Sequence, residues 1–157
     1  MYERILVPVD GSAPAMLGLR EAIRLASRHG GQLHLVHVVD ELPVIEPPAG
    51  APVLDSVLLA LRSAGEAVLA DAAAEALSAG VTADRCLIEE FGGTAGPRII
   101  QEAASWKPDL IVCGTHGRRG LGRFVMGSDA EYIVRRSPVP VLLVPAHLPQ
   151  SAAARAA

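Results

Sequence analysis

The sequence predicts an α/β protein with a five-stranded parallel sheet and helices on both faces. Short apolar runs alternate with stretches of helical periodicity along the chain, beginning and ending on a strand. Such alternation is typical of parallel sheets with right-handed crossovers, which place helices on both faces. The first run, Ile-Leu-Val-Pro-Val over residues 5–9, is continuously apolar, as in strands buried on both faces.

The first strand is expected over residues 5–9, with Pro8 marking its end because proline cannot donate to a ladder. Asp10-Gly-Ser12 then turns the chain, and Ser12 can cap a helix whose first turn tolerates Pro14. Gly30-Gly31 ends that helix.

The second strand is expected over residues 33–39, where His34 and His37 are interpreted as satisfying local hydrogen bonds. Four prolines make residues 43–56 a long loop, and an Ala-rich helix follows from about Val57 to Leu77. The later elements follow the same alternation: a strand over 81–90, a helix from Pro97, a strand over 109–113, a helix from Ser128 and a strand over 141–144. Residues 1–145 therefore form a single domain, and 146–157 a flexible tail.

Composition excludes several classes of protein. The 157 residues are half apolar, 3% aromatic, and carry a net charge of −3, so neither nucleic acid nor an anionic membrane surface is an expected partner. No apolar run approaches the ~20 residues that span a bilayer. The two cysteines, Cys86 and Cys113, show no metal spacing, and the N-terminus shows no signal-peptide pattern, which favours the reducing cytoplasm.

The most informative motif reads Gly114-Thr115-His116-Gly117, then nine residues, then Gly127-Ser128. Glycines let backbone N–H groups approach a ligand, and a helix that begins at Ser128 offers unpaired N–H groups with partial positive charge. The intervening loop adds cationic charge through Arg118, Arg119 and Arg123. Together these features predict a polyphosphate site.

A structural interpretation of Ser128 stands beside this one. Ser128-Asp-Ala-Glu131 fits a capping box, in which the serine accepts a backbone N–H and the glutamate reaches back. Ser128 is then a helix cap and nothing more.

Ligands of parallel sheets bind outside the carboxyl ends of strands, where the strand order reverses. Asp10 follows the first strand, Val38 and Val39 end the second, and Gly114 follows the fourth. If the first and fourth strands are neighbours, these residues converge on one crevice.

Several mechanisms lack their residues. The first turn carries no G-x-G-x-x-G, no G-x-x-x-x-G-K-[ST] occurs, and no Gly-x-Ser-x-Gly elbow is present. A phospho-acceptor domain would need clustered acids at the first turn, where Asp10 stands alone. His116 has no visible partner for proton transfer, so any hydrolysis is expected to be slow.

Four segments resemble the universal stress protein family: the glycine motif, the opening Ile5-Leu-Val-Pro-Val-Asp10-Gly-Ser12, His37-Val-Val-Asp40, and Ser137-Pro-Val-Pro-Val-Leu-Leu-Val144. The resemblance covers Tyr2 to about Pro145. It implies a Rossmann-like sheet with strand order 3-2-1-4-5, usually in a homodimer, and membership of the subgroup with an intact ATP-binding motif.

By this resemblance, main chain near Pro8, Val9 and Val38 meets adenine, and Asp10 meets the ribose or a metal-linked group. Gly114, His116, Gly117, Gly127 and Ser128 hold the phosphates, with Mg²⁺ as a bridging ion. The full implied set for ATP also includes Thr115, Arg118, Arg119 and Asp129. Asp129 departs from the small or apolar residue common there, and its carboxylate repels a triphosphate unless Mg²⁺ lies between them.

Three functions remain open at this point. The first is an ATP-binding stress-response regulator whose nucleotide state tunes its dimer or partners; the second is a slow Mg²⁺-dependent ATPase using the same site. The third is a dimeric interaction module without nucleotide. The homodimer is expected to form through the edge strand of Val141, Leu142, Leu143 and Val144, because an exposed apolar edge needs cover.

Overall fold

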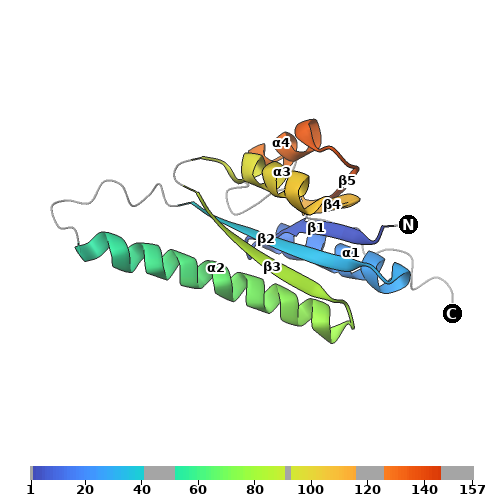
Figure 1. The fold of residues 1–157 in the computed structure, drawn as a ribbon, viewed down its shortest axis with the longest axis horizontal. Coiled ribbons are helices and arrows are strands. Elements are labelled where there is room, and N and C mark those ends of the chain that lie inside the picture. Colours follow the sequence, from blue (N-terminus) through green and yellow to red (C-terminus); the bar gives the residue numbers. More distant parts are fainter. Residues whose placement is uncertain (1, 41–51, 91–92, 116–125, 146–157) are drawn as a thin grey trace.

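The computed structural model describes residues 2–40, 52–90, 93–115 and 126–145. The elements alternate along the chain: β1 (Arg4–Pro8), α1 (Ala13–His29), β2 (Gln32–Asp40), α2 (Pro52–Ser78), β3 (Ala83–Glu90), α3 (Ala95–Trp106), β4 (Leu110–Gly114), α4 (Ser128–Arg136) and β5 (Val141–Val144). The five strands form one parallel sheet in the order β3-β2-β1-β4-β5 (Figure 1). The predicted fold class and strand order are confirmed.

Helices cover both faces of the sheet, α1 and α2 on one and α3 and α4 on the other (Figure 1). Successive side chains of β1 point to opposite faces of the sheet. Ile5 and Val7 pack with α1 and α2, and Leu6 packs with α3 and α4. All three are fully buried. This double burial is the reason the strand reads as one continuous apolar run.

The predicted ends of α1 are confirmed. Ser12 is the N-cap, and its side chain accepts a hydrogen bond from the amide of Ala15. Gly30 ends the helix in the left-handed conformation at φ 68°, which glycine adopts without strain.

The predicted loop over residues 43–56 extends too far at its C-terminal end, because its last five residues are helical. α2 begins at Pro52, so residues 52–56 are helical and not loop. A proline is compatible with the first position of a helix, because its missing N–H would have no partner within the helix there. Residues 41–51 lie outside the described residues.

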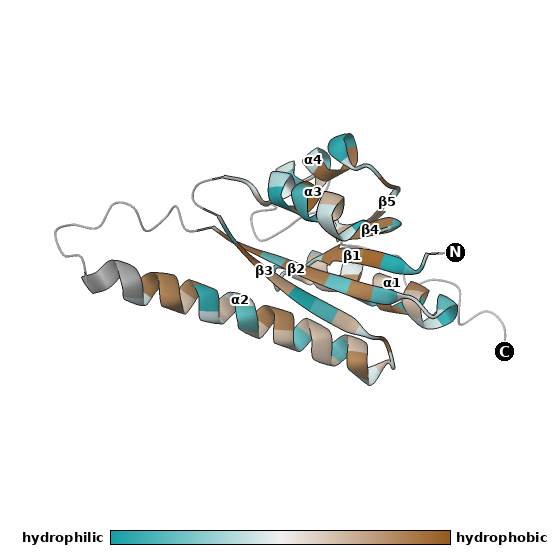
Figure 2. Cartoon of the chain, viewed as in Figure 1, coloured by the Kyte–Doolittle hydropathy of each residue, from teal (hydrophilic) through white to brown (hydrophobic). Residues whose placement is uncertain are grey.

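Beyond its grey start, α2 carries both hydrophobic and hydrophilic bands (Figure 2), and Leu69, Ala72 and Ala76 pack into the core against the sheet. The packing is close at Gly65, where an added Cβ would lie 2.8 Å from side-chain atoms of His37 and Leu87. In the described part of the chain, no helix is long and apolar enough to cross a membrane.

Candidate functional site

The turn after β1 lies at the carboxyl edge of the sheet, beside the second half of β2, which runs four residues beyond the end of β1. The amide of Val9 donates to the carbonyl of Val36 at 2.8 Å, which extends the ladder one residue beyond β1. Asp10 accepts the amide of Ser12 on Oδ1 at 2.9 Å. Gly11 between them has φ 77°, so this position needs glycine for its backbone conformation.

His37 of β2, which the sequence predicts to satisfy a local hydrogen bond, contacts the backbone at this edge. Its Nδ1 lies 2.7 Å from the carbonyl oxygen of Val9, and its ring is buried. Because a carbonyl only accepts, Nδ1 carries the proton of this bond. The bond agrees with the expectation of a locally satisfied strand histidine, and it fixes the backbone at one of the predicted site residues.

Gly114 ends β4 directly beneath the first turn of α1. A Cβ added there would lie 2.5 Å from the carbonyl oxygen of Pro14, which is closer than Cβ atoms approach non-bonded atoms in proteins. The packing of α1 against β4 therefore requires glycine at this position, whether or not a ligand binds.

The two ends of the glycine loop meet beside β5. Thr115 donates its amide to the carbonyl of Val144 at 3.1 Å, and Gly127 donates its amide to the carbonyl of Thr115 at 2.9 Å. These bonds bring the start of α4 to the end of β4, as the spacing of the motif predicts. The other predicted residues of the loop lie outside the described residues: His116, Gly117, Arg118 and Arg119, together with Arg123.

The start of α4 does not form the capping box. Gly127 is the N-cap, which has no side chain to cap the helix, and Ser128 is the first helical residue. Glu131 pairs with Arg135 one turn further on, at 3.0 Å, and does not reach back. The capping-box interpretation of Ser128 is therefore wrong, because the helix begins one residue earlier than that motif requires.

Asp129 in the first turn of α4 contacts a neighbouring helix. Its Oδ1 accepts the amide of Gly96, at the start of α3, at 2.8 Å. The two helices pack closely there, since a Cβ on Gly96 would lie 2.9 Å from Cβ of Tyr132. Asp129 thus satisfies one of the unpaired donors at the N-terminus of α3.

The structure brings Pro8, Val9, Asp10, Val38, Gly114, Thr115, Gly127, Ser128 and Asp129 to one region, the carboxyl ends of the four strands β1, β2, β4 and β5 and the adjoining helix starts. The chain is thus a doubly wound α/β protein with a candidate ligand site where the strand order reverses, between β1 and β4.

The chain belongs to the universal stress protein family, whose sequence pattern matches residues 1–145. It is 33% identical over 145 residues to universal stress protein MJ0531 of Methanocaldococcus jannaschii, covering 92% of this chain and 82% of that protein. It is also 33% identical over 144 residues to a universal stress protein of Thermus aquaticus, covering 92% of this chain and 99% of that protein.

Solved structures share the fold. Universal stress protein UspA from Lactobacillus plantarum matches with a TM-score of 0.77 and 26% identity, over 91% of this chain and 97% of that one. Other universal stress proteins with the same fold were solved in complex with cAMP, with AMP bound (from Arabidopsis thaliana) and in complex with dAMP (from Archaeoglobus fulgidus). Those three are 22%, 16% and 23% identical to this chain.

Proposed function

We propose that the carboxyl edge of the sheet binds ATP, and that the bound nucleotide regulates the dimer or the partner contacts of this protein. The observation that carries the proposal is the start of α4, where the N-cap is Gly127, a residue without a side chain that could cap the helix. The first turn of a helix has unpaired N–H groups and partial positive charge, which suit a phosphate group. The bond between Gly127 and Thr115 holds this helix start at the end of β4.

A comparison of three glycines at this edge supports the same proposal, because only two of them are required by the fold. Gly11 is needed for its positive φ, and Gly114 is needed for the packing of α1. Gly127 has φ −61° and ψ 148°, which any residue adopts, so its backbone conformation does not call for glycine. Close approach of a ligand to the backbone is a reason for glycine at this position.

Adenine is the expected base because the edge offers fixed backbone groups. His37 holds the backbone at Val9, and Asp10 is held at the turn by the amide of Ser12. Main chain near Pro8, Val9 and Val38 would read the base, and the Asp10 carboxylate would accept from the ribose. The bound cAMP, AMP and dAMP of the fold relatives share this adenine ring.

Mg²⁺ fits the triphosphate at the start of α4. Asp129 and Glu131 both lie in the first turn of this helix and repel an unscreened phosphate. Asp129 Oδ1 is bonded to Gly96, yet a carboxylate has further acceptor positions for an ion. The ion would offset the acidic charge beside the phosphates, and oxygen ligands suit it.

Mass spectrometry of ligand released from denatured, purified protein tests the proposal first, and an adenine nucleotide is expected. Calorimetry at matched Mg²⁺ should then show tighter binding of ATP than of GTP. Gly127→Val should weaken ATP binding at least tenfold in a folded protein, whereas Gly30→Asn, at a remote helix end that tolerates asparagine, should leave it unchanged. Equal or tighter GTP binding, or full affinity in Gly127→Val, would contradict the proposal.

Two other functions are outcomes of the same experiments. Turnover of ATP with Mg²⁺ that is lost in His116→Ala would indicate a slow ATPase at this site. Absence of both copurified and added nucleotide binding would indicate an interaction module.

We further propose a homodimer through β5, which is an edge strand of the sheet. Val141, Leu142 and Leu143 remain partly exposed in the single chain, and an apolar edge is usually covered. A two-fold contact would cover both copies at once. Light scattering at micromolar concentration should show a dimer, and a Val141→Lys, Leu143→Lys double variant should be monomeric or aggregated; a monomeric wild type would contradict this.

A further inference from the structure

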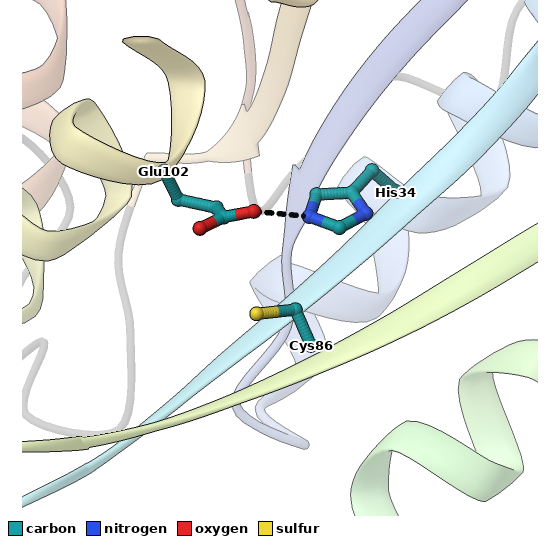
Figure 3. Close-up of side chains that lie close together, drawn as sticks. All are labelled: His34, Cys86 and Glu102. Carbon is teal, nitrogen blue, oxygen red and sulfur yellow. Dashed lines mark hydrogen bonds and ion pairs between the residues drawn. The ribbon is translucent and has the colours of Figure 1, made fainter. Parts of the chain in front are cut away.

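A group of polar side chains lies on the α3 side of the sheet, away from the carboxyl edge. His34 of β2, Cys86 of β3 and Glu102 of α3 converge there (Figure 3). His34 is in register with Leu6 of β1 and lies four residues before Val38, which is ~13 Å along β2 at 3.3 Å per residue. This group, the His34 cluster, is therefore separate from the proposed nucleotide site.

The ring of His34 is buried and fixed from three directions. Nδ1 lies 2.9 Å from Oδ1 of Asp84, and Nε2 lies 2.8 Å from Oε1 of Glu102. The ring also stacks on Trp106, with centroids 4.7 Å apart and an interplanar angle of 11°. The orientation of the ring is thus set before any ligand arrives.

The hydrogen bonds of the ring leave an excess of acceptors. A neutral imidazole has one N–H, and donating it to Asp84 makes Nε2 an acceptor that faces a carboxylate acceptor of Glu102. A positive centre, either a proton or a metal ion, is needed between these two atoms. A histidine whose other nitrogen bonds a carboxylate is also the usual arrangement of a metal-ligating histidine.

Cys86 adds a third ligand type. The ligand atoms of His34, Cys86 and Glu102 all lie within 4.8 Å of one another. In a tetrahedral zinc site with bonds of 2.0–2.3 Å, ligand atoms are about 3.5 Å apart. Rotation about the side-chain bonds of Glu102 and Cys86 can close a difference of this size without moving the backbone.

The cluster also has a route to solvent. Glu102 lines a cavity of about 280 Å³ between β3 and α3, together with Ile88, Glu89, Arg98, Gln101 and Ser105. Glu102 reaches from this opening to the buried ring through its contact with Nε2, and Cys86 is half-buried. An ion can enter from this side, and water can supply a fourth ligand.

We propose that His34 Nε2, Cys86 Sγ and Glu102 form a binding site for a tetrahedral divalent transition metal ion, Zn²⁺ being the expected ion. The nitrogen, sulfur and oxygen ligands match those that zinc prefers, and three protein ligands leave one position for water. Asp84 is the outer carboxylate that orients the histidine. The ion would take the place of the proton between His34 and Glu102 and tie β2, β3 and α3 together.

Titration of reduced, tag-free, chelator-treated protein with Co²⁺ tests this site, because Co²⁺ reports its geometry and its sulfur ligand in the absorption spectrum. Wild type should show the intense visible bands of tetrahedral Co²⁺ and a sulfur-to-cobalt charge-transfer band. Cys86→Ser should lose the charge-transfer band and bind at least tenfold more weakly. Cys113→Ser, which removes the buried thiol of β4, should retain both properties.

Zn²⁺ binding by competition with a coloured chelator provides the second measurement. Glu102→Gln should weaken Zn²⁺ at least tenfold, and Glu89→Gln, a carboxylate of the same cavity outside the ligand set, should bind as wild type does. Both glutamine variants keep the hydrogen-bonding shape, and circular dichroism checks that they fold. Absence of tetrahedral bands in wild type, or equal Zn²⁺ affinity in wild type, Cys86→Ser and Glu102→Gln, would overturn the proposal.

Discussion

The carboxyl edge and the His34 cluster belong to the same sheet, yet they are constructed from different parts of the chain. At the carboxyl edge the defining contacts are made by backbone: the amides of Gly127 and Thr115, the carbonyl of Val9, and the close approach of Pro14 to Gly114. In the His34 cluster they are made by side chains from three elements. A region built from backbone is disrupted by adding atoms, whereas one built from side chains is disrupted by removing them.

The largest expected effect follows from adding atoms at the carboxyl edge. Gly114→Val should lower the free energy of unfolding by about 3 kcal/mol, the upper part of the range for overpacking, because its Cβ meets backbone and not a movable side chain. Urea denaturation measures the loss. The matched variant Gly127→Val should lose less than about 1 kcal/mol, since its φ and ψ suit any residue. Equal losses in the two variants would remove the distinction drawn between these glycines.

At the carboxyl edge, Asp129 makes its contact through a side chain, so removing side-chain atoms from it should destabilise the protein. Asp129→Ala should lower the free energy of unfolding by about 1–2 kcal/mol, because the amide of Gly96 at the start of α3 loses its acceptor. Asp129→Asn keeps an oxygen at Oδ1 and should lose less than half as much. Thermal denaturation of the pair checks this, and an Ala variant as stable as wild type would contradict it.

The two serines at helix starts form a third test. Ser12→Ala should cost about 1 kcal/mol, because Ser12 caps α1 through its side chain. Ser128→Ala should change stability by no more than about 0.5 kcal/mol, because Ser128 is the first helical residue of α4 and not its N-cap. The same change at Ser128 should weaken ATP binding. Ser12 is thus expected to affect stability, and Ser128 is expected to affect nucleotide affinity. A loss of stability at Ser128 equal to that at Ser12 would restore the capping interpretation.

The smallest expected effect concerns the reactivity of the Cys113 thiol, which lies near the carboxyl end of β4. Burial raises the pKa of Cys113, in β4, to about 12. A raised pKa means less thiolate at a given pH, so at pH 8 roughly one thiol in ten thousand is ionised. In a Cys86→Ser background, Cys113 should therefore react with a thiol reagent far more slowly in the folded protein than in urea. Rapid labelling of the folded protein would indicate that β4 opens at its carboxyl end.

Local signals in the sequence predicted most of the fold. The caps at Ser12 and Gly30 and the continuous apolar run of β1 each depend on a few adjacent residues, and the structure confirms them. The predicted start of α2 is too late because a proline cluster usually indicates a break, although the last proline of the cluster, Pro52, opens the helix. At α4 the sequence is compatible with Ser128 as the N-cap or as the first helical residue, and in the structure it is the first helical residue.

The candidate site was predictable where it follows strand ends, and not where it depends on contacts across elements. Asp10, Val38 and Gly114 come to one edge because parallel strands end together. The bond between Asp129 and Gly96 joins residues 33 positions apart, and that between His34 and Glu102 joins residues 68 positions apart. Neither pair leaves a spacing pattern, so His34 and Cys86 each read as an ordinary strand residue.

The position of β1 has a consequence for the order of events during synthesis. β1 precedes the other four strands of the sheet in the chain, yet it lies in the middle of the sheet, and its second neighbour begins only at Leu110. Before the ribosome reaches β4, the strands β1, β2 and β3 can already pair. The other edge of β1 then has no strand to which it can hydrogen-bond. Long-range parallel pairing is slow, and an unpaired strand edge attracts other chains. The nascent protein therefore carries β1, with its buried apolar side chains, half-paired until β4 has emerged.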